Sequence, residues 1–132
     1  MAGNNVTHKQ NFEQLECWKA CRGLRLFVVK KVVPILPAEE RYRLTDQLIR
    51  SARSTTANIA EGDGRFHYLD NAKYCRISRG SSKKVLDHII TANDEDLITD
   101  DMLLDCRILV ERAVKLLSAY IRYLTKAQIS DN

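Results

Sequence analysis

Glycine and proline are scarce in this chain of 132 residues, which contains five glycines and two prolines. Loop-rich folds and β-sandwiches need many such turn residues, so their scarcity argues against both classes. No apolar stretch approaches the roughly 20 residues that a membrane-spanning helix requires. The first residues contain no apolar signal region, so we expect a cytoplasmic rather than a secreted protein. The length predicts one domain.

The motifs of the common enzyme classes are also absent. The chain has no phosphate-binding loop, no Gly-x-Gly-x-x-Gly, no Gly-x-Ser-x-Gly and no Glu-x-x-His pair of the kind that holds two iron ions in helical bundles. Its four cysteines form no Cys-x-x-Cys pair and lie on or beside apolar stripes, so we expect reduced core residues rather than metal ligands. We therefore expect no catalytic residues, no cofactor and no metal site.

Apolar residues repeat at helical spacing in four segments, and no strand pattern competes with them. We predict helices over about residues 11–33, 37 or 38–62, 68–92 and 100–126. Pro34 and Pro37 should end the first helix, and Pro37 suits the first turn of the second. Gly62 is predicted to close the second helix in a left-handed conformation. Gly80 marks either a close approach to another backbone or a break, and we favour an unbroken third helix.

Four helices with short connections predict an all-α fold, an antiparallel up-down-up-down four-helix bundle. We assign residues 11–127 to the bundle, 1–10 to a flexible N-terminal tail and 128–132 to a C-terminal tail. The expected inward face of the third helix is Tyr74, Ile77, Ser81, Val85 and Ile89. The fourth helix carries a seven-residue apolar repeat, formed by Leu103, Cys106, Val110, Ala113, Leu117, Tyr120 and Leu124. A second apolar set either widens this core face or contacts another subunit: Leu109, Leu116, Ile121 and Tyr123.

The stretch 46–65 is unusual for a helix because it is rich in serine, threonine and asparagine, which are poor helix formers. Gln47, Ser51 and Ser54 are spaced as a polar ladder, and Asn58 and Glu61 face one side. One interpretation is a hydrogen-bond network between helices that reaches Ser81. The other is a polar pocket or an RNA contact near the turn at residues 62–65.

Charge is distributed unevenly along the chain. Residues 41–84 hold ten basic and four acidic residues, whereas residues 85–105 hold seven acidic residues and no lysine or arginine. Three interpretations stay open: an anion-binding face, head-to-tail pairing between copies of the chain, or a solvated surface without a partner. The candidate RNA-binding residues are the ten cations of the basic segment: Arg41, Arg43, Arg50, Arg53, Arg65, Lys73, Arg76, Arg79, Lys83 and Lys84.

Several short patterns resemble one protein family. Phe12, Leu15 and Trp18 form an early aromatic-Leu-x-x-Trp segment, and Pro37 with Glu40 forms a Pro-x-x-Glu helix start. A longer pattern then follows, formed by Gln47, Arg50, Ser54, Asn58, Ile59, Ala60, Glu61 and Gly62, and later by Gly80 and Ser81. Over about residues 12–125 the chain resembles the four-helix-bundle family of 23S ribosomal RNA intervening-sequence proteins. It departs from the family at Lys84, where glutamate is common, so a charge pair with a neighbouring copy would be lost or reversed.

The resemblance implies a small cytoplasmic bacterial protein that assembles into a ring-like homopentamer and has no catalytic residues. Related bundles are accessory proteins of diversity-generating retroelements and bind RNA and a reverse transcriptase. We expect the motif residues Gln47, Ser54, Asn58, Glu61, Gly62, Gly80 and Ser81 to be structural. The predicted function is non-enzymatic binding of structured RNA, either ribosomal or intervening-sequence RNA, by a homo-oligomer with a basic surface. The alternative is an assembly or adaptor protein with a protein partner such as a retroelement reverse transcriptase.

Overall fold

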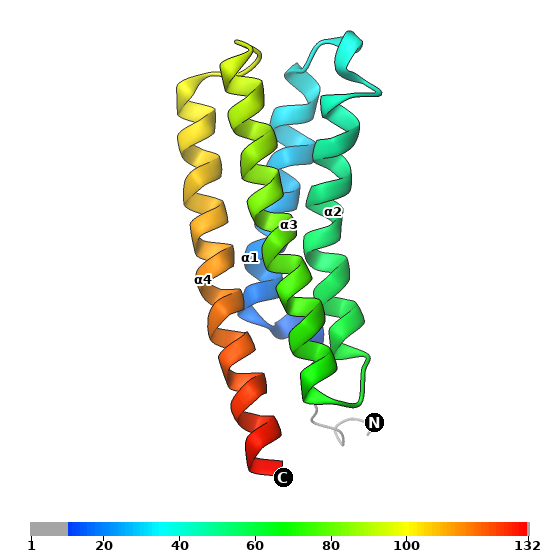
Figure 1. Ribbon diagram of the computed structural model, residues 1–132. Helices are drawn as coiled ribbons and strands as arrows, with labels where there is room; N and C mark the ends of the chain where they lie inside the picture. The colour runs from blue at the N-terminus through cyan, green and yellow to red at the C-terminus, as the bar shows by residue number, and fades with distance from the viewer. Residues whose placement is uncertain (1–10, 132) are drawn as a thin grey trace, which may run out of the picture.

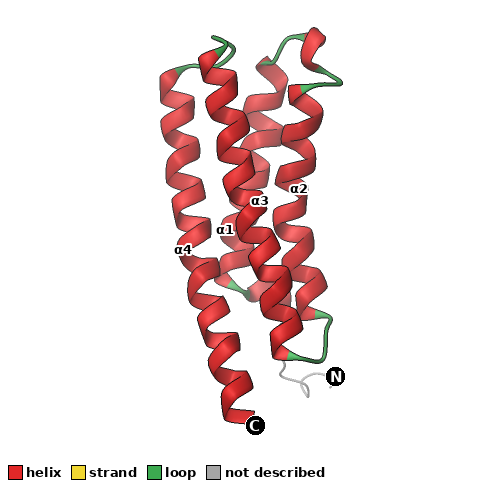
Figure 2. Ribbon diagram, in the orientation of Figure 1, coloured by secondary structure: helices red, strands yellow, loops and turns green. Residues whose placement is uncertain are grey.

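The computed structural model describes residues 11–131, and four long helices dominate it. They are α1 (Glu16–Phe27), α2 (Leu44–Asp63), α3 (Tyr68–Asp94) and α4 (Asp100–Asp131), and no strand occurs among the described residues. Successive helices run in opposite directions, and each packs against its two neighbours in the order α1, α2, α3, α4 and back to α1 (Figures 1 and 2). The predicted all-α, up-down-up-down bundle is confirmed.

The first predicted helix is divided into pieces of different geometry. A 3₁₀ turn at Phe12–Gln14 precedes extended Leu15, and α1 begins only at Glu16. After Phe27 the chain continues as a wider π-helix over Val28–Val32 and a 3₁₀ turn over Val33–Ile35. Pro34 accounts for the change, because it has no N–H to donate and its ring collides with a regular helical carbonyl. The helical path thus ends close to the predicted position but not as a regular α-helix.

The second helix begins later than predicted. Ala38–Glu40 forms a single 3₁₀ turn, and α2 starts at Leu44. The backbone of Arg43, with φ −123° and ψ −107°, lies outside the helical region and interrupts the path. The Glu40 carboxylate accepts a hydrogen bond from the Leu44 N–H at 3.3 Å, which satisfies one of the free donors at the start of α2.

The prediction for Gly62 was wrong, because none of the described glycines has a positive φ. Gly62 lies inside the last turn of α2, and Gly64 with φ −78° follows the helix end. Glycine is needed at 62 for a different reason: a Cβ there would lie 2.6 Å from Asn71 Oδ1 and 3.0 Å from the Asn71 carbonyl oxygen of α3. By contrast, α3 runs unbroken through Gly80, where an added Cβ would meet nothing within 4 Å.

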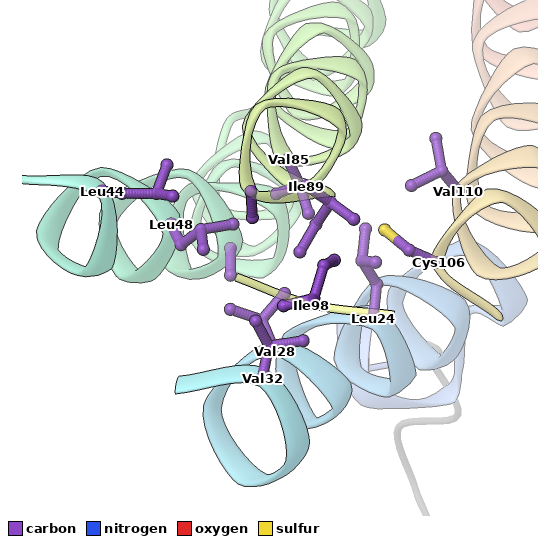
Figure 3. Close-up of a cluster of buried hydrophobic side chains, with 12 residues drawn as sticks. Leu24, Val28, Val32, Leu44, Leu48, Val85, Ile89, Ile98, Cys106 and Val110 are labelled. Carbon is purple, nitrogen blue, oxygen red and sulfur yellow. The ribbon is translucent and has the colours of Figure 1, made fainter. Parts of the chain in front are cut away.

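Two apolar clusters fill the bundle. One lies toward the α3–α4 turn and takes residues from all four helices, among them Leu24, Leu48, Ile89 and Val110 (Figure 3). The other lies toward the α2–α3 turn and is formed by Cys17, Cys21, Ile59, Ala72, Cys75, Ala113, Leu117, Ile121 and Leu124. All four cysteines are buried and free, as expected.

The inward face of α3 differs from the prediction. Val85 and Ile89 are buried, but Ile77 is 43% exposed, and Tyr74 and Ser81 are only partly buried. The fully buried face instead includes Cys75, Ser78 and Ser82, because α3 must contact both α2 and α4. Ile77 was predicted to be buried because it is apolar, but small serines occupy the buried positions where α3 packs against its neighbours.

The predicted seam of α4 faces the core, with Leu103 and Tyr120 only partly buried. In the second set Ile121 is buried, Leu109 and Leu116 pack at the edge of the core, and Tyr123 is 60% exposed. The surplus apolar residues therefore mainly widen the core face. The helix also continues to Asp131, past its predicted end at Lys126. The predicted N-terminal tail, residues 1–10, lies outside the described residues.

Candidate nucleic-acid interface

A hydrogen-bond network joins α2 to α3 through the polar stretch that the sequence singled out. The hydroxyls of Ser54 and Ser81 lie 2.8 Å apart, and Asn58 Nδ2 donates to both the carbonyl and the hydroxyl oxygen of Ser54 at 2.9 Å. The interhelical network that was one of the two interpretations is therefore present. Gln47 does not take part: its side chain is exposed and forms none of these hydrogen bonds.

A second polar layer is fully buried between the two apolar clusters. Ser78 donates to the Thr55 carbonyl at 2.7 Å, across the α2–α3 contact, and Ser82 donates to the Ser78 carbonyl at 3.1 Å. Cys21 of α1 lies 3.8 Å from the Ser78 hydroxyl and 3.9 Å from that of Ser82. Burial raises the pKa of the Cys21 thiol, so the layer is held by neutral groups.

The motif residues near the α2–α3 turn hold that turn in place. Glu61 pairs with Arg65 at 2.9 Å, and Arg65 also donates to the Tyr74 hydroxyl at 2.7 Å with its guanidinium over the Tyr74 ring. The hydrogen bonds that Arg65 donates to the Glu61 carboxylate raise the pKa of Arg65, with a smaller effect from Tyr74. Gly62 admits α3 close to α2, as described above. Most of the motif residues thus make contacts within the bundle, whereas Gln47 and Gly80 make no such contact among the described residues.

The ten candidate cations do not form one patch. Nine are exposed, and Arg79 is partly buried and donates to the Ser118 hydroxyl of α4 at 3.1 Å. Arg41 and Arg43 lie in the connection before α2. Arg53 lines a shallow groove between α1 and α2 together with Arg25, which the sequence analysis did not select.

Carboxylates form ion pairs with two of the ten candidate cations, one on α2 and one shortly after its end. Arg50 pairs with Asp46 at 2.9 Å, and Arg65 pairs with Glu61 at the same distance. Both pairs are exposed, so each contributes little to stability, but each neutralises charge that a phosphate would otherwise meet. The anion-binding capacity of α2 is therefore lower than its sequence suggests.

The outward face of α3 presents the densest group of unpaired cations. Residues 71–86 contain no acidic residue, and four of their cations are exposed and form no ion pair among the described residues: Lys73, Arg76, Lys83 and Lys84. We call these four the α3 cation row. At about 1.5 Å of rise per residue the row is roughly 16 Å long, which matches about five phosphates at about 3.4 Å of duplex axis each.

A pocket of about 680 Å³, which the sequence analysis missed, lies at the α2–α3 end of the bundle. Its lining brings together the turn after α2 and the last turns of α4, which are more than fifty residues apart in the chain. The sequence feature that indicates this site is a run of three aromatic residues directly after Arg65: Phe66, His67 and Tyr68.

Two features are absent from the described residues. None of their helices has the length and apolarity to cross a membrane. Their His, Cys, Asp and Glu side chains form no group of three that could hold a metal ion.

Comparison with known proteins places this geometry in a family. No curated protein matches the chain. The family described as 23S rRNA-intervening sequence protein matches residues 13–119, which include α1, α2, α3 and most of α4. The match thus covers the polar network, the Gly62 contact and the α3 cation row. The chain belongs to the 23S rRNA-intervening sequence protein family.

Proposed function

We propose that this protein is a non-enzymatic RNA-binding bundle whose α3 cation row contacts the phosphates of a structured RNA. The observation that carries the proposal is the row itself: four exposed cations on one helix, without carboxylate partners among the described residues. Lysine and arginine without partners neutralise phosphates, release bound counterions and so provide affinity that does not depend on sequence. The family's name supports ribosomal or intervening-sequence RNA as the ligand.

A salt series with matched variants tests the proposal. The protein is titrated against a fluorescent ribosomal RNA hairpin and a DNA duplex of equal length. Replacing Lys83 and Lys84 together by alanine should lower the slope of log K against log salt by about 1.4–1.8, since each lost phosphate contact accounts for about 0.7–0.9. The control is the double replacement of Arg112 and Lys115, two exposed cations of α4, which should leave the slope unchanged.

Two results would contradict the proposal. In one, the double replacement on α3 and the double replacement on α4 reduce the slope equally, which would mean that RNA is attracted by the overall charge and not by one face of the protein. In the other, wild-type protein binds RNA and DNA with the same weak affinity, which would mean that structured RNA is not its ligand.

A second function, assembly of identical chains or docking of a protein partner, is favoured by one observation. Leu104 and Ile108 lie one turn apart on α4, and each is more than half exposed, at 55% and 56%. Adjacent exposed apolar side chains are typical of contact surfaces. The homo-oligomer expected from the family, a pentamer, could use this face, while the four free cysteines support a reducing, cytoplasmic location.

A further inference from the structure

The pocket at the α2–α3 end is lined with aromatic rings from two directions. The turn contributes Phe66, which is 99% exposed, and Tyr68. From α4 come Tyr120 and Tyr123, whose rings are stacked with centroids 6.0 Å apart and planes 13° from parallel. In Figure 1 this is the lower end of the bundle, where α4 extends beyond the other helices. The volume of about 680 Å³ lies within the roughly 300–1,000 Å³ of small-ligand sites.

One charged group of this pocket has no partner. Glu16 at the rim is paired with Lys19 at 3.3 Å, and Arg65 is paired with Glu61. Asp63 is half-buried, and its carboxylate forms neither a hydrogen bond nor an ion pair with any described residue. A half-buried carboxylate beside aromatic rings is an acceptor that a ligand with N–H donors can satisfy.

Two neighbouring polar side chains, Asn71 and Tyr120, already have partners, so they do not compete for Asp63. Asn71 Nδ2 donates to the Tyr120 hydroxyl at 3.4 Å, and Asn71 Oδ1 accepts from the Cys75 thiol at 3.5 Å. Burial, with smaller contributions from the charges of Cys75 and Asp63, raises the pKa of Tyr120 to about 12. Asp63 therefore lies close enough to Tyr120 for its charge to act inside the pocket.

We propose that this pocket binds an unpaired guanine base of the RNA, which stacks on Phe66 and Tyr123 and donates its N1–H and N2–H to the Asp63 carboxylate. This inference rests on the proposed RNA binding and adds a base-reading site to it. Unstacked bases in RNA loops and bulges are commonly recognised by aromatic stacking together with hydrogen bonds to the base edge. Guanine is the base whose Watson–Crick edge presents two adjacent donors, the arrangement that one carboxylate accepts.

One unpaired cation lies near the pocket on its α3 side. Arg65 lines the pocket, but its charge is already balanced by Glu61. Lys73, the first residue of the α3 cation row, forms no ion pair among the described residues and lies 6.0 Å from the centre of the Tyr74 ring, over which the Arg65 guanidinium also lies. Lys73 would therefore attract the phosphate attached to a bound base.

The test compares two RNA hairpins that differ in one bulged base, guanine or adenine, and therefore carry the same number of phosphates. Wild-type protein should bind the guanine bulge roughly tenfold more tightly. Asp63→Asn should abolish this preference but retain binding, because the amide offers a donor where guanine needs an acceptor. Phe66→Ala should weaken binding of both bulges by roughly tenfold through lost stacking, and Phe66→Trp should restore it.

Control variants remove similar groups elsewhere. Tyr42→Ala removes an exposed ring at the opposite end of the bundle, and Asp105→Asn removes an exposed carboxylate of α4. Neither should change the ratio of the two affinities. Phe66 is almost fully exposed, so its loss does not threaten folding.

The outcomes separate this inference from the proposed function. If neither hairpin binds, RNA binding itself is wrong. If both bind equally and Phe66→Ala has no effect, RNA binding stands and the base site is wrong. Binding of N-acetyl-arginine amide that Asp63→Asn abolishes, without any preference between the hairpins, would overturn the guanine assignment in favour of a protein side chain.

Discussion

Replacing Gly62 and Gly80 by alanine, one at a time, tests the close contact between α2 and α3. Both glycines lie inside helices, where alanine is more stable by about 1 kcal/mol. They differ in their surroundings. At Gly80 an added Cβ meets open space, so Gly80→Ala should gain the full propensity difference. At Gly62 the Cβ would lie 2.6 Å from Asn71 Oδ1, 3.0 Å from the Asn71 carbonyl oxygen and 3.1 Å from Tyr74 Cβ.

The magnitude at Gly62 follows from which of these atoms can move. The Asn71 amide can rotate away, at the cost of its contact with Tyr120. Its carbonyl oxygen and Tyr74 Cβ belong to the α3 backbone region, so relieving those contacts displaces the helix. Such overpacking costs about 1–3 kcal/mol, which equals or exceeds the propensity gain of about 1 kcal/mol and leaves Gly62→Ala destabilised by about 0–2 kcal/mol.

The measurement is urea unfolding of both variants, with thermal unfolding in parallel. The two free energies of unfolding should differ by about 1–3 kcal/mol, and for a chain of this size each 1 kcal/mol corresponds to roughly 3–5 °C in Tm. Gly80→Ala should unfold above wild type and Gly62→Ala at or below it. Equal stabilisation by both replacements would refute the close approach at Gly62.

Two further predictions concern the thiols and the exposed face of α4. Burial raises the pKa of Cys17, Cys75 and Cys106 to about 12, so at pH 8 these thiols should resist iodoacetamide in the folded protein and react once urea unfolds it; rapid labelling without urea would show that the core opens. Replacing Leu104 and Ile108 by glutamate should reduce the oligomer mass measured by light scattering while helical circular dichroism is unchanged, and an unaltered mass would mean that this face is not an assembly contact.

Helical periodicity predicted the four helices and their order, because each helix buries one apolar stripe. The details it missed depend on neighbours. Ile77 was assigned to the core for its apolarity, yet it is 43% exposed, and the neighbouring Ser78 lies at the α2–α3 contact instead. Gly62 was assigned a helix-capping conformation, but its role is to admit the α3 backbone.

The candidate sites were predictable to different degrees. The cations of α3 follow directly from residues 71–86, where no acidic residue intervenes. The four-residue spacing of Asp46 and Arg50 predicts an ion pair on a helix, which makes Arg50 a weaker candidate for binding phosphate. The aromatic pocket was not predictable, because Phe66 and Tyr123 come to line one pocket only when α4 folds back along the bundle.

The buried layer of Ser78, Thr55 and Cys21 determines the register of the bundle. Leucine, isoleucine and valine pack acceptably at several relative heights, so the apolar clusters alone would tolerate a helix that slides by one turn, about 5.4 Å. A slide of α3 along α2 would carry the Ser78 hydroxyl away from the Thr55 carbonyl and into apolar surroundings. Each buried polar group that loses its partner costs about 1–3 kcal/mol. The layer therefore selects one register of α3 along α2. This register also determines how far the cations of α3 lie from the pocket along the bundle axis.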